Sequence, residues 1–233
     1  MSKVRVRDGG VVPHDAPFIV EAFDSTVPHL AAIGSGEMWG SPFSEKEGFA
    51  EETADDVRKS DKYRTTGEGE ALRIFVAEVN VEPGAAAPFP DSAAERPGLR
   101  YRTADDGTRM LSVGAAFVRD NWLPGHVESQ FHVDAIRAEL EGNAGFAYMD
   151  VLVSDFRTGH HRKGAGEALL RRAVDYGLEK GMKALYVDAW AGNERKLVGW
   201  YERQGFTAVA DFGMKRGNGT TWPGALMRMS LGS

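Results

Sequence analysis

Residues Thr158–Ala173 read TGHHRKGAGEALLRRA and combine three features that suit an anion. Two basic residues, Arg162 and Lys163, directly precede Gly164 and Gly166, and a run with helical apolar spacing follows. A helix that begins at the glycines would present free N–H groups and the positive end of its dipole to a phosphate. The stretch therefore predicts a phosphate-binding turn, with a flexible loop before an ordinary helix start as the alternative.

Two familiar nucleotide-binding motifs do not fit this stretch. A P-loop needs G-x-x-x-x-G-K-[ST], and Gly159 and Gly164 have that spacing, but Ala165 and Gly166 occupy the places of the lysine and the hydroxyl residue. The dinucleotide pattern G-x-G-x-x-G would need a third glycine where Leu169 stands. A phosphate held here would belong to another kind of ligand.

Two aspartates interrupt apolar runs that read as strands. Asp150 lies in GFAYMDVLV, residues 145–153, and Asp188 lies in KALYVDAW, residues 183–190. A charged side chain in such a run needs a partner or a function. Each aspartate is a candidate functional residue and equally a candidate for a structural bond.

The residues that usually bind metals are either absent or scattered. The chain has no cysteine, which excludes disulfides, thiolate zinc sites and a cysteine nucleophile. No carboxylate set of recognisable spacing completes a site around His160–His161, His126 or His132. We predict no metal site and place these histidines on the surface or in loops.

A mixed α+β fold must position these residues, because apolar runs of strand type and of helix type both occur. The expected strands are residues 3–8, 71–79, 109–120, 145–153, 183–190, 207–212 and 224–231. The expected helices are residues 18–33 with an interruption near Pro28, 44–59 opened by a capping box of Ser44 and Glu47, 133–141, a helix from the glycines to Lys180, and 194–203 capped by Asn193. Strand 145–153 is nearly apolar throughout and is expected to be central. The strand–helix–strand order of the second half implies a parallel crossover.

Composition limits the class of protein. The 233 residues, 42% of them hydrophobic, suit a single domain of residues 1–233 with a sizeable core. Residues 81–98 are proline-rich and predict an excursion at a sheet edge. The net charge of −6 argues against nucleic acid as a partner. The absence of a signal peptide or membrane-length apolar run predicts a cytoplasmic protein without a membrane partner.

The second half of the sequence resembles the GNAT superfamily of N-acetyltransferases over roughly residues 147–206. That family has a [QR]-x-x-G-x-[GA] loop after an apolar strand, and later an asparagine, an aromatic–tyrosine pair and a GF dipeptide. The matching residues here are His161–Gly166, Asn193, Trp200, Tyr201, Gly205 and Phe206. His161 stands where the family has glutamine or arginine, and the loop is longer than usual, so Arg157 and Arg162 are the candidates for that role.

The resemblance implies a GNAT fold, a mixed and mostly antiparallel sheet with a splayed parallel strand pair, and acetyl-CoA as co-substrate without a metal. It places the acceptor in about residues 1–142 and acetyl-CoA in about residues 143–233. Main-chain groups of Leu152 and Val153 at the splay would bind the pantetheine. The groups that would hold the pyrophosphate are Arg162 and the amides of Lys163, Gly164, Ala165, Gly166 and Glu167. Asn193 would contact the pantetheine, or serve only as a helix N-cap.

The resemblance also implies the chemistry. Tyr201 would protonate the departing thiolate, or else be an ordinary core aromatic, with Trp200 or Leu197 expected to fill core. A main-chain N–H near Leu152 would meet the oxyanion. Asp150 would be the general base, with Asp188 as its rival and removal of the proton by solvent as a third option. The remaining pair, Met38 and Trp39, would line the acceptor pocket or plug the core.

The implied activity is transfer of an acetyl group from acetyl-CoA to a primary amine of a small molecule. A protein or peptide acceptor, an acyl group longer than acetyl, and a non-catalytic module that binds acyl-CoA are the alternatives. A homodimer is compatible with all of them.

Overall fold

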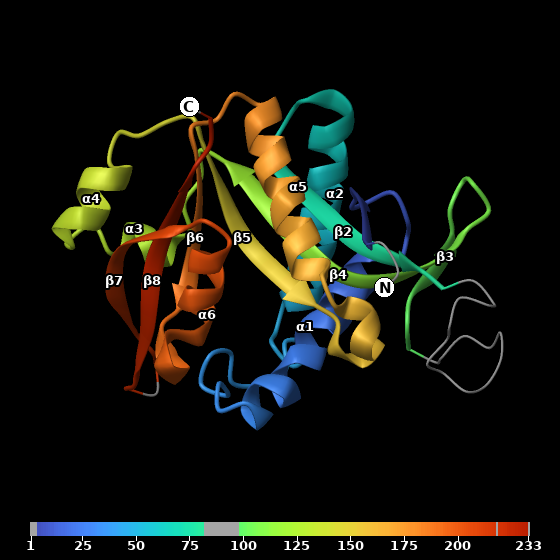
Figure 1. Ribbon diagram of the computed structural model, residues 1–233, viewed down its shortest axis with the longest axis horizontal. Coiled ribbons are helices and arrows are strands. Elements are labelled where there is room, and N and C mark those ends of the chain that lie inside the picture. Colours follow the sequence, from blue (N-terminus) through green and yellow to red (C-terminus); the bar gives the residue numbers. More distant parts are fainter. Residues whose placement is uncertain (1–3, 82–97, 218, 233) are drawn as a thin grey trace. The chain divides into compact units, whose positions relative to one another are not determined.

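The computed structural model describes residues 4–81, 98–217 and 219–232, drawn in Figure 1 as a ribbon coloured along the sequence. The excursion expected at residues 81–98 lies, apart from its two ends, outside the described residues and stays a prediction. None of the described helices combines the length and the apolar character that crossing a membrane requires.

The described elements have the predicted mixed α+β character, and each of the expected strands is present. In chain order they are β1 (Val4–Asp8), α1 (Asp15–Ala32), α2 (Phe49–Thr66), β2 (Leu72–Asn80), β3 (Tyr101–Thr103), β4 (Arg109–Asp120), α3 (Gly125–Glu128), α4 (Asp134–Leu140), β5 (Phe146–Ser154), a 3₁₀ helix (Phe156–Arg162), α5 (Ala165–Glu179), β6 (Ala184–Trp190), α6 (Gly192–Arg203), β7 (Thr207–Lys215) and β8 (Thr221–Ser230).

The strands form a sheet in the order β1-β2-β4-β5-β6-β8-β7, and β3 pairs with β4. The β1–β2, β3–β4, β6–β8 and β7–β8 pairs are antiparallel, whereas β5 and β6 are parallel. β5 stands in the middle of this order, as its nearly apolar sequence predicts. In the described residues the β5–β6 register runs from Phe146 opposite Ala184 to Tyr148 opposite Tyr186 and ends there. The parallel pair therefore parts beyond Tyr148, as expected of a splayed pair.

Helix α1 continues through Pro28 to Ala32, so the interruption expected near Pro28 is wrong. Proline removes one backbone N–H and crowds the preceding turn, which usually breaks a helix. Here Phe18, Ile19 and Phe23 form a buried stripe along the helix. Tertiary packing of such a stripe supplies most of a helix's stability in a protein and outweighs the lost bond.

The predicted capping box of Ser44 and Glu47 is also wrong. Gly48 is the N-cap of α2, with a φ of 80°, and no side chain caps this end. Asp24 instead accepts a hydrogen bond from the Ser44 N–H at 3.0 Å. The helix also extends beyond its expected end and stops at Gly67, whose φ of 71° suits glycine.

Two short elements, β3 and α3, were not expected from the sequence. With three and four residues respectively, neither is long enough to carry a recognisable period. The segment between β4 and β5 therefore contains two helices, α3 and α4, rather than the single helix predicted at residues 133–141.

The chain divides into two compact units, and α1, β4, β5 and α5 contribute residues to both. Unit 1 comprises Met1–Val27, Ser41–Ala116 and Leu152–Arg172, and unit 2 comprises Pro28–Gly40, Phe117–Val151 and Ala173–Ser233. The expected single domain, with halves that divide near residue 142, stays a prediction.

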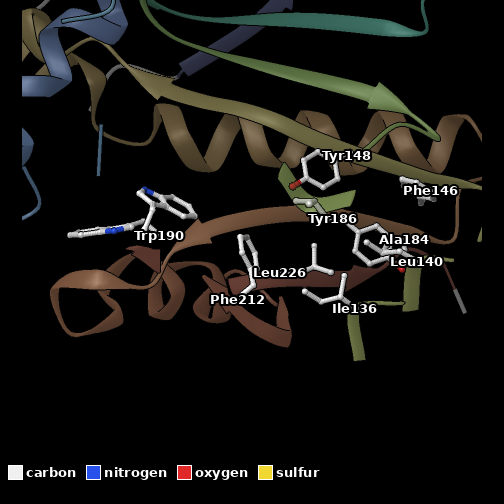
Figure 2. Packing of buried hydrophobic residues seen from close by; sticks show 11 residues of the cluster. Ile136, Leu140, Phe146, Tyr148, Ala184, Tyr186, Trp190, Phe212 and Leu226 are labelled. Atoms are coloured by element: carbon white, nitrogen blue, oxygen red, sulfur yellow. The ribbon is translucent and has the colours of Figure 1, made fainter. Parts of the chain in front are cut away.

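Unit 2 is built around an apolar cluster on one face of β5, β6 and β8, drawn in Figure 2. Side chains two residues apart on a strand share a face. The cluster accordingly takes alternate residues of the strands together with side chains of α3 and α4, and its members are Val127, Ile136, Leu140, Phe146, Tyr148, Ala184, Tyr186, Trp190, Phe212, Trp222 and Leu226. The segment between β4 and β5 thus covers the face of the sheet on which Tyr148 and Tyr186 lie.

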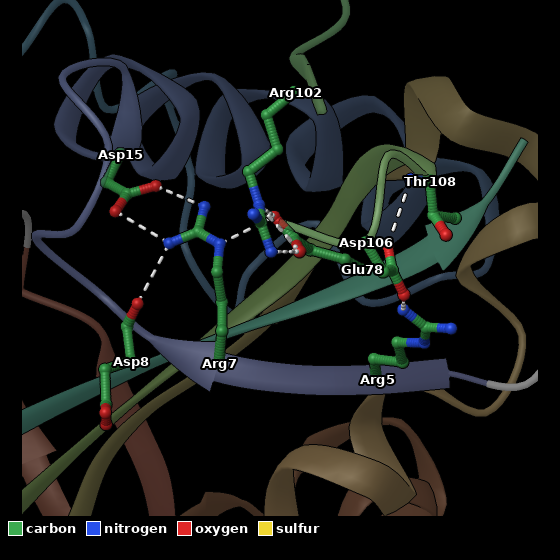
Figure 3. A network of polar contacts seen from close by, with 8 residues as sticks. All are labelled: Arg5, Arg7, Asp8, Asp15, Glu78, Arg102, Asp106 and Thr108. Carbon is green, nitrogen blue, oxygen red and sulfur yellow. Dashed lines mark hydrogen bonds and ion pairs between the residues drawn. The ribbon is translucent and has the colours of Figure 1, made fainter. Parts of the chain in front are cut away.

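Unit 1 contains a buried ionic group, which we call the Glu78 cluster: Arg7, Asp15, Glu78 and Arg102 (Figure 3). The Arg7 guanidinium donates to Asp15 and to Glu78, each at 2.6 Å, and Arg102 donates to Glu78 at 2.7 Å. The side chains of Asp15 and Glu78 are 0% and 1% exposed. Burial opposes the charge of Glu78, but the two arginines outweigh it and lower the pKa of that carboxyl.

Candidate active site

The most polar part of the unit 2 core lies around Asp188 on β6. Tyr148 on β5 donates a hydrogen bond to Oδ1 of Asp188, and Nε2 of His126 on α3 lies 3.2 Å from Oδ2. The side chains of His126 and Asp188 are 32% and 15% exposed, whereas Tyr148 is fully buried. We call these three residues the Asp188 cluster.

The strand registers explain why these groups meet. Tyr148 lies opposite Tyr186 in the β5–β6 pair, and Asp188 is two residues beyond Tyr186 on the same face. Asp150 is two residues beyond Tyr148 on β5, so its side chain lies on the same face. A carboxylate on this otherwise apolar face needs hydrogen bonds, and Tyr148 and His126 supply them to Asp188.

The charge of Asp188 contributes to the pKa values of its neighbours. Burial raises the pKa of Tyr148, and the adjacent Asp188 carboxylate raises it further. Burial alone would lower the pKa of His126, but the hydrogen bond to Asp188 and the charges of Asp188 and Asp150 outweigh it, so the pKa is raised above 6.5. Neither Tyr148 nor His126 was predicted to be part of the site.

Tyr201 on α6 lies within electrostatic reach of the same carboxylate. Its side chain is 6% exposed, and its ring makes edge contacts with the rings of Trp200 and Phe206. Burial, followed by the charge of Asp188, raises the pKa of the Tyr201 hydroxyl. Within the described residues this hydroxyl makes no hydrogen bond. Of the two residues expected to fill the core, Leu197 packs against the apolar cluster, whereas Trp200 is half-buried.

Asp150 has a structural partner, one of the two options that its sequence position left open. Its Oδ2 lies 3.3 Å from Nε of Arg119, whose side chain is 9% exposed. The Arg119 guanidinium also lies over the ring of Trp122, 4.7 Å from its centroid. Asp150 therefore forms part of a partly buried ion pair on the same sheet face as the Asp188 cluster.

The turn before α5 has the form that anion binding requires. Gly164 has a φ of 85°, and the first backbone bond at this end runs from the Ala168 N–H to the Gly164 carbonyl at 3.0 Å. The N–H groups that take part in no hydrogen bond among the described residues are those of Gly164, Ala165, Gly166 and Glu167. A helix start with four free amides is a ready anion site.

The residues that flank this turn differ in whether their polar groups are free to bind a ligand. The Lys163 N–H donates to the His160 carbonyl at 3.1 Å, so it does not join the four free amides. Arg157 is held by Asp155 at 2.7 Å and by Glu21 at 3.2 Å. Arg162 lies over the ring of Phe156, and burial lowers its pKa. Of the two arginines considered for the family's glutamine or arginine, Arg162 is the one without an ion pair among the described residues.

The main chain of β5 near Leu152 and Val153 lies beyond the last residue that pairs with β6. Leu152 is half-buried and the Val153 side chain is 2% exposed. On the other side, a Cβ at Gly114 of β4 would lie 2.7 Å from the Val153 carbonyl, so only glycine allows this close approach. The proposed contacts of Leu152 and Val153 with pantetheine stay a prediction.

The prediction that Asn193 is the N-cap of α6 is wrong, because Ala191 occupies that position. Asn193 has a φ of 48°, and its Nδ2 donates to the Ile33 carbonyl at 2.9 Å and to Oγ of Ser35 at 2.7 Å. The side chain therefore ties the segment after α1 to the start of α6. Its contact with pantetheine stays a prediction.

Met38 and Trp39 lie in the loop after α1. The Met38 carbonyl accepts hydrogen bonds from Nη2 of Arg216 at 2.8 Å and from Nε1 of Trp222 at 3.0 Å, and its side chain packs against the apolar cluster. Trp39 is half-buried. Met38 thus partly plugs the core, and the role of both residues in an acceptor pocket stays a prediction.

The four histidines considered as metal ligands in the sequence contact other side chains or backbone. The rings of His160 and His161 lie 4.2 Å apart, His126 pairs with Asp188, and Nδ1 of His132 lies 3.0 Å from the Ser129 carbonyl. In the described part of the chain no three metal-binding side chains come together.

Comparisons with known proteins place this site in a family. Residues 113–206, which hold the Asp188 cluster, Tyr201 and the glycine turn, match the model of the acetyltransferase (GNAT) family. No curated protein matches the sequence significantly. Several solved structures share the fold at identities too low to show more than the fold.

A GCN5-related N-acetyltransferase from Kribbella flavida is 17% identical, covers 98% of this chain and 98% of that chain, and has a TM-score of 0.52. The protein yncA from Salmonella typhimurium, solved with its cofactor acetyl-CoA, is 15% identical over 99% of this chain and 95% of that chain, with a TM-score of 0.54. The paia N-acetyltransferase from Thermoplasma acidophilum, in complex with coenzyme A, is 13% identical over 98% of this chain and 99% of that chain, with a TM-score of 0.51. Residues 113–206 therefore carry the sequence of a GNAT-family acetyltransferase, and the fold around them is one that solved N-acetyltransferases share.

Proposed function

We propose that this protein transfers the acetyl group of acetyl-CoA to a primary amine of a small molecule. The observation that carries the proposal is the row of free N–H groups at Gly164, Ala165, Gly166 and Glu167. Structures of similar fold are N-acetyltransferases, and one of them holds coenzyme A and another acetyl-CoA. Their co-substrate carries the pyrophosphate that such a row of amides suits.

The turn fits a pyrophosphate sterically as well as electrostatically. Among the described residues, a Cβ at Gly164 would have only the Val4 side chain near it, at 3.9 Å, so this side of the turn is open in that part of the chain. The positive φ of Gly164 turns the following amides outward without strain. Arg162 and Lys163 add positive charge beside the amides. In this proposal the four amides bind the pyrophosphate and Arg162 supports its charge.

Acetyl-CoA supplies the activated acyl carbon, and the protein supplies proton transfer and orientation. Tyr201 donates a proton to the departing sulfur. Its raised pKa keeps the hydroxyl protonated at neutral pH, and no described residue competes for that proton. A main-chain N–H near Leu152 stabilises the developing oxyanion.

The burial of the residues around Asp188 favours a small acceptor over a large one. Tyr148 and Tyr201 are 0% and 6% exposed, and side chains of α3 and α4 pack on the same face of the sheet. Little of these reactive groups is reachable from outside, whereas a peptide or protein acceptor needs an open groove. The Asp188 carboxylate gives the region negative charge, which favours an amine that arrives as an ammonium ion.

Calorimetric titration of protein freed of bound ligand tests the proposed co-substrate. We expect saturable binding of acetyl-CoA and of CoA, and none of NAD or ATP at the same concentrations. Equal binding of ATP would mean that the turn recognises phosphate without the rest of CoA, and absence of acetyl-CoA binding would overturn the proposal.

Replacing Gly164 with valine is expected to raise the Kd for acetyl-CoA about 100-fold. Valine is strained at a φ of 85°, and relaxing that strain turns the following amides away from the pyrophosphate. Loss of two hydrogen bonds to a charged group, at about 1.5 kcal/mol each, accounts for the change. Calorimetry measures it.

Gly107→Val is the matched control for that variant. Gly107 also belongs to unit 1 and has a φ of 80°, and no atom of the described residues that are not its chain neighbours lies within 4 Å of its Cβ position. Backbone strain should therefore be similar, but binding should be unchanged. Equal losses of affinity in the two variants would show that strain, and not the phosphate turn, is responsible.

A further inference from the structure

We propose that His126 is the catalytic base of this enzyme, with Asp188 and Tyr148 as the residues that position it. The inference rests on the proposed function, and it replaces Asp150 and removal of the proton by bulk solvent as the route by which the acceptor amine loses its proton. It begins from the geometry of the Asp188 cluster.

The hydrogen bond to Asp188 selects one form of the neutral imidazole. Nε2 of His126 lies 3.2 Å from Oδ2, and a carboxylate only accepts, so the proton of neutral His126 lies on Nε2. The lone pair that can take a proton is then on Nδ1. Within the described residues Nδ1 makes no hydrogen bond. The side chain is 32% exposed, so a small molecule can reach it.

The carboxylate is itself held from the other side. Tyr148, which is fully buried, donates to Oδ1 of Asp188 while His126 lies at Oδ2. The two oxygens therefore have different fixed partners, and Asp188 cannot rotate without losing one. This arrangement resembles the support that a carboxylate gives to a catalytic imidazole in hydrolases.

The Asp188 carboxylate acts electrostatically on both the proton acceptor and the proton donor. Nε2 of His126 contacts Asp188 directly, and the same charge, after burial, raises the pKa of the Tyr201 hydroxyl. Asp150, paired with Arg119, faces His126 as the second charged group. Protonation of the departing sulfur is assigned to Tyr201.

An unsatisfied donor lies further along the same strand face. Trp190 is two residues beyond Asp188 and 5% exposed, and its buried Nε1–H has no hydrogen-bond partner in the described residues. Figure 2 shows this side chain at the edge of the apolar cluster. Buried donors are nearly always satisfied, so this one suits a ligand acceptor on the face that His126 borders.

The proton balance of the step is complete. Nδ1 of His126 takes one proton from the ammonium group of the acceptor and later passes it to solvent. The freed nitrogen lone pair forms the C–N bond and the C–S bond breaks. The amide nitrogen loses a second proton to solvent, and the sulfur gains one from Tyr201, which solvent restores. The net products are the acetylated amine, CoA and one proton.

The test compares kcat/KM for the best amine acceptor in wild type, His126→Ala and His132→Ala. His126→Ala should lose at least 100-fold, the lower range for general base catalysis. Added imidazole should restore part of the loss, and the Kd for acetyl-CoA should not change. His132 lies in the same segment and is exposed, so its variant should match wild type.

The pH profile supplies a readout that a purely structural role would not move. In wild type kcat/KM should rise with pH through a midpoint above 6.5, because the neutral imidazole is the active form and its pKa is raised. Asp188→Asn removes the charge that raises this pKa but keeps an oxygen for Tyr148. The midpoint for His126, followed also by NMR titration of its ring, should then move to lower pH, and kcat should fall.

The outcomes separate this inference from the proposed function. If the wild-type protein transfers acetyl to an amine and His126→Ala is as fast as His132→Ala, the role of His126 is overturned. The proposed function would still stand. A loss in His126→Ala that imidazole cannot restore, with an unchanged pH midpoint in Asp188→Asn, would also overturn it. Wild-type protein that binds acetyl-CoA but transfers to no amine would defeat the proposed function and this inference together.

Discussion

Tyr201→Phe is expected to lower kcat about 100- to 10,000-fold while the Kd for acetyl-CoA stays within about twofold. The variant removes only the hydroxyl that we assign to protonation of the leaving sulfur. Because this hydroxyl makes no hydrogen bond among the described residues, its loss leaves no buried partner unsatisfied and the fold should be intact. Steady-state turnover and calorimetry on the same preparation measure both quantities.

Tyr176→Phe is the matched control for Tyr201→Phe. Tyr176 is 2% exposed and its hydroxyl donates to Asp120 at 2.8 Å, so the variant also removes a buried phenol oxygen. It should keep wild-type turnover and lose some stability. Wild-type turnover in Tyr201→Phe would make Tyr201 a packing residue.

Glu78→Ala is expected to destabilise the folded protein by about 3–5 kcal/mol, the usual cost of removing one partner from a buried ion pair. Glu78 is 1% exposed, and both Arg7 and Arg102 donate to it, as Figure 3 shows. The variant leaves Arg7 with Asp15 alone and leaves Arg102 without its carboxylate. Urea unfolding followed by fluorescence measures the difference.

Asp106→Ala is the exposed counterpart. Asp106 pairs with Arg5 on the surface at 3.0 Å, where both side chains are more than half exposed, so its loss should change stability little. A loss in Asp106→Ala as large as that in Glu78→Ala would contradict the importance of burial.

The pH dependence of stability has a definite sign. The folded pKa of Glu78 is lower than its ordinary value of 4.5, so its contribution is complete above that value. It is lost as pH falls from there through the folded pKa. The stability difference between wild type and Glu78→Ala should therefore shrink on acidification.

Much of the fold could be predicted because the strands have strong patterns. The apolar runs of β4, β5 and β6 show their positions within a residue or two. The failures arose where tertiary contacts override local preference. Pro28 lies inside α1. Ser44, which was expected to begin a helix, instead donates its backbone N–H to Asp24.

The candidate site was predicted in part. The glycine turn was visible because its residue types carry the physics of anion binding locally. Tyr148 and Asp188 offered a weaker signal, since each is a polar group on the buried face of an apolar strand. His126 offered none: it belongs to the short helix α3, and only the folding of residues 121–145 over the sheet brings it to Asp188.

Transfer of labelled acetyl to an amine is the most direct test of the account. The protein would be incubated with [¹³C]acetyl-CoA and a panel of primary amines that includes polyamines, amino acids and amino sugars, and the products identified by mass spectrometry. We predict one or more amines with the labelled acetyl group on nitrogen and an equal amount of CoA. Release of CoA with labelled acetate alone, or no release with any amine, would contradict the assignment of this protein as an amine acetyltransferase.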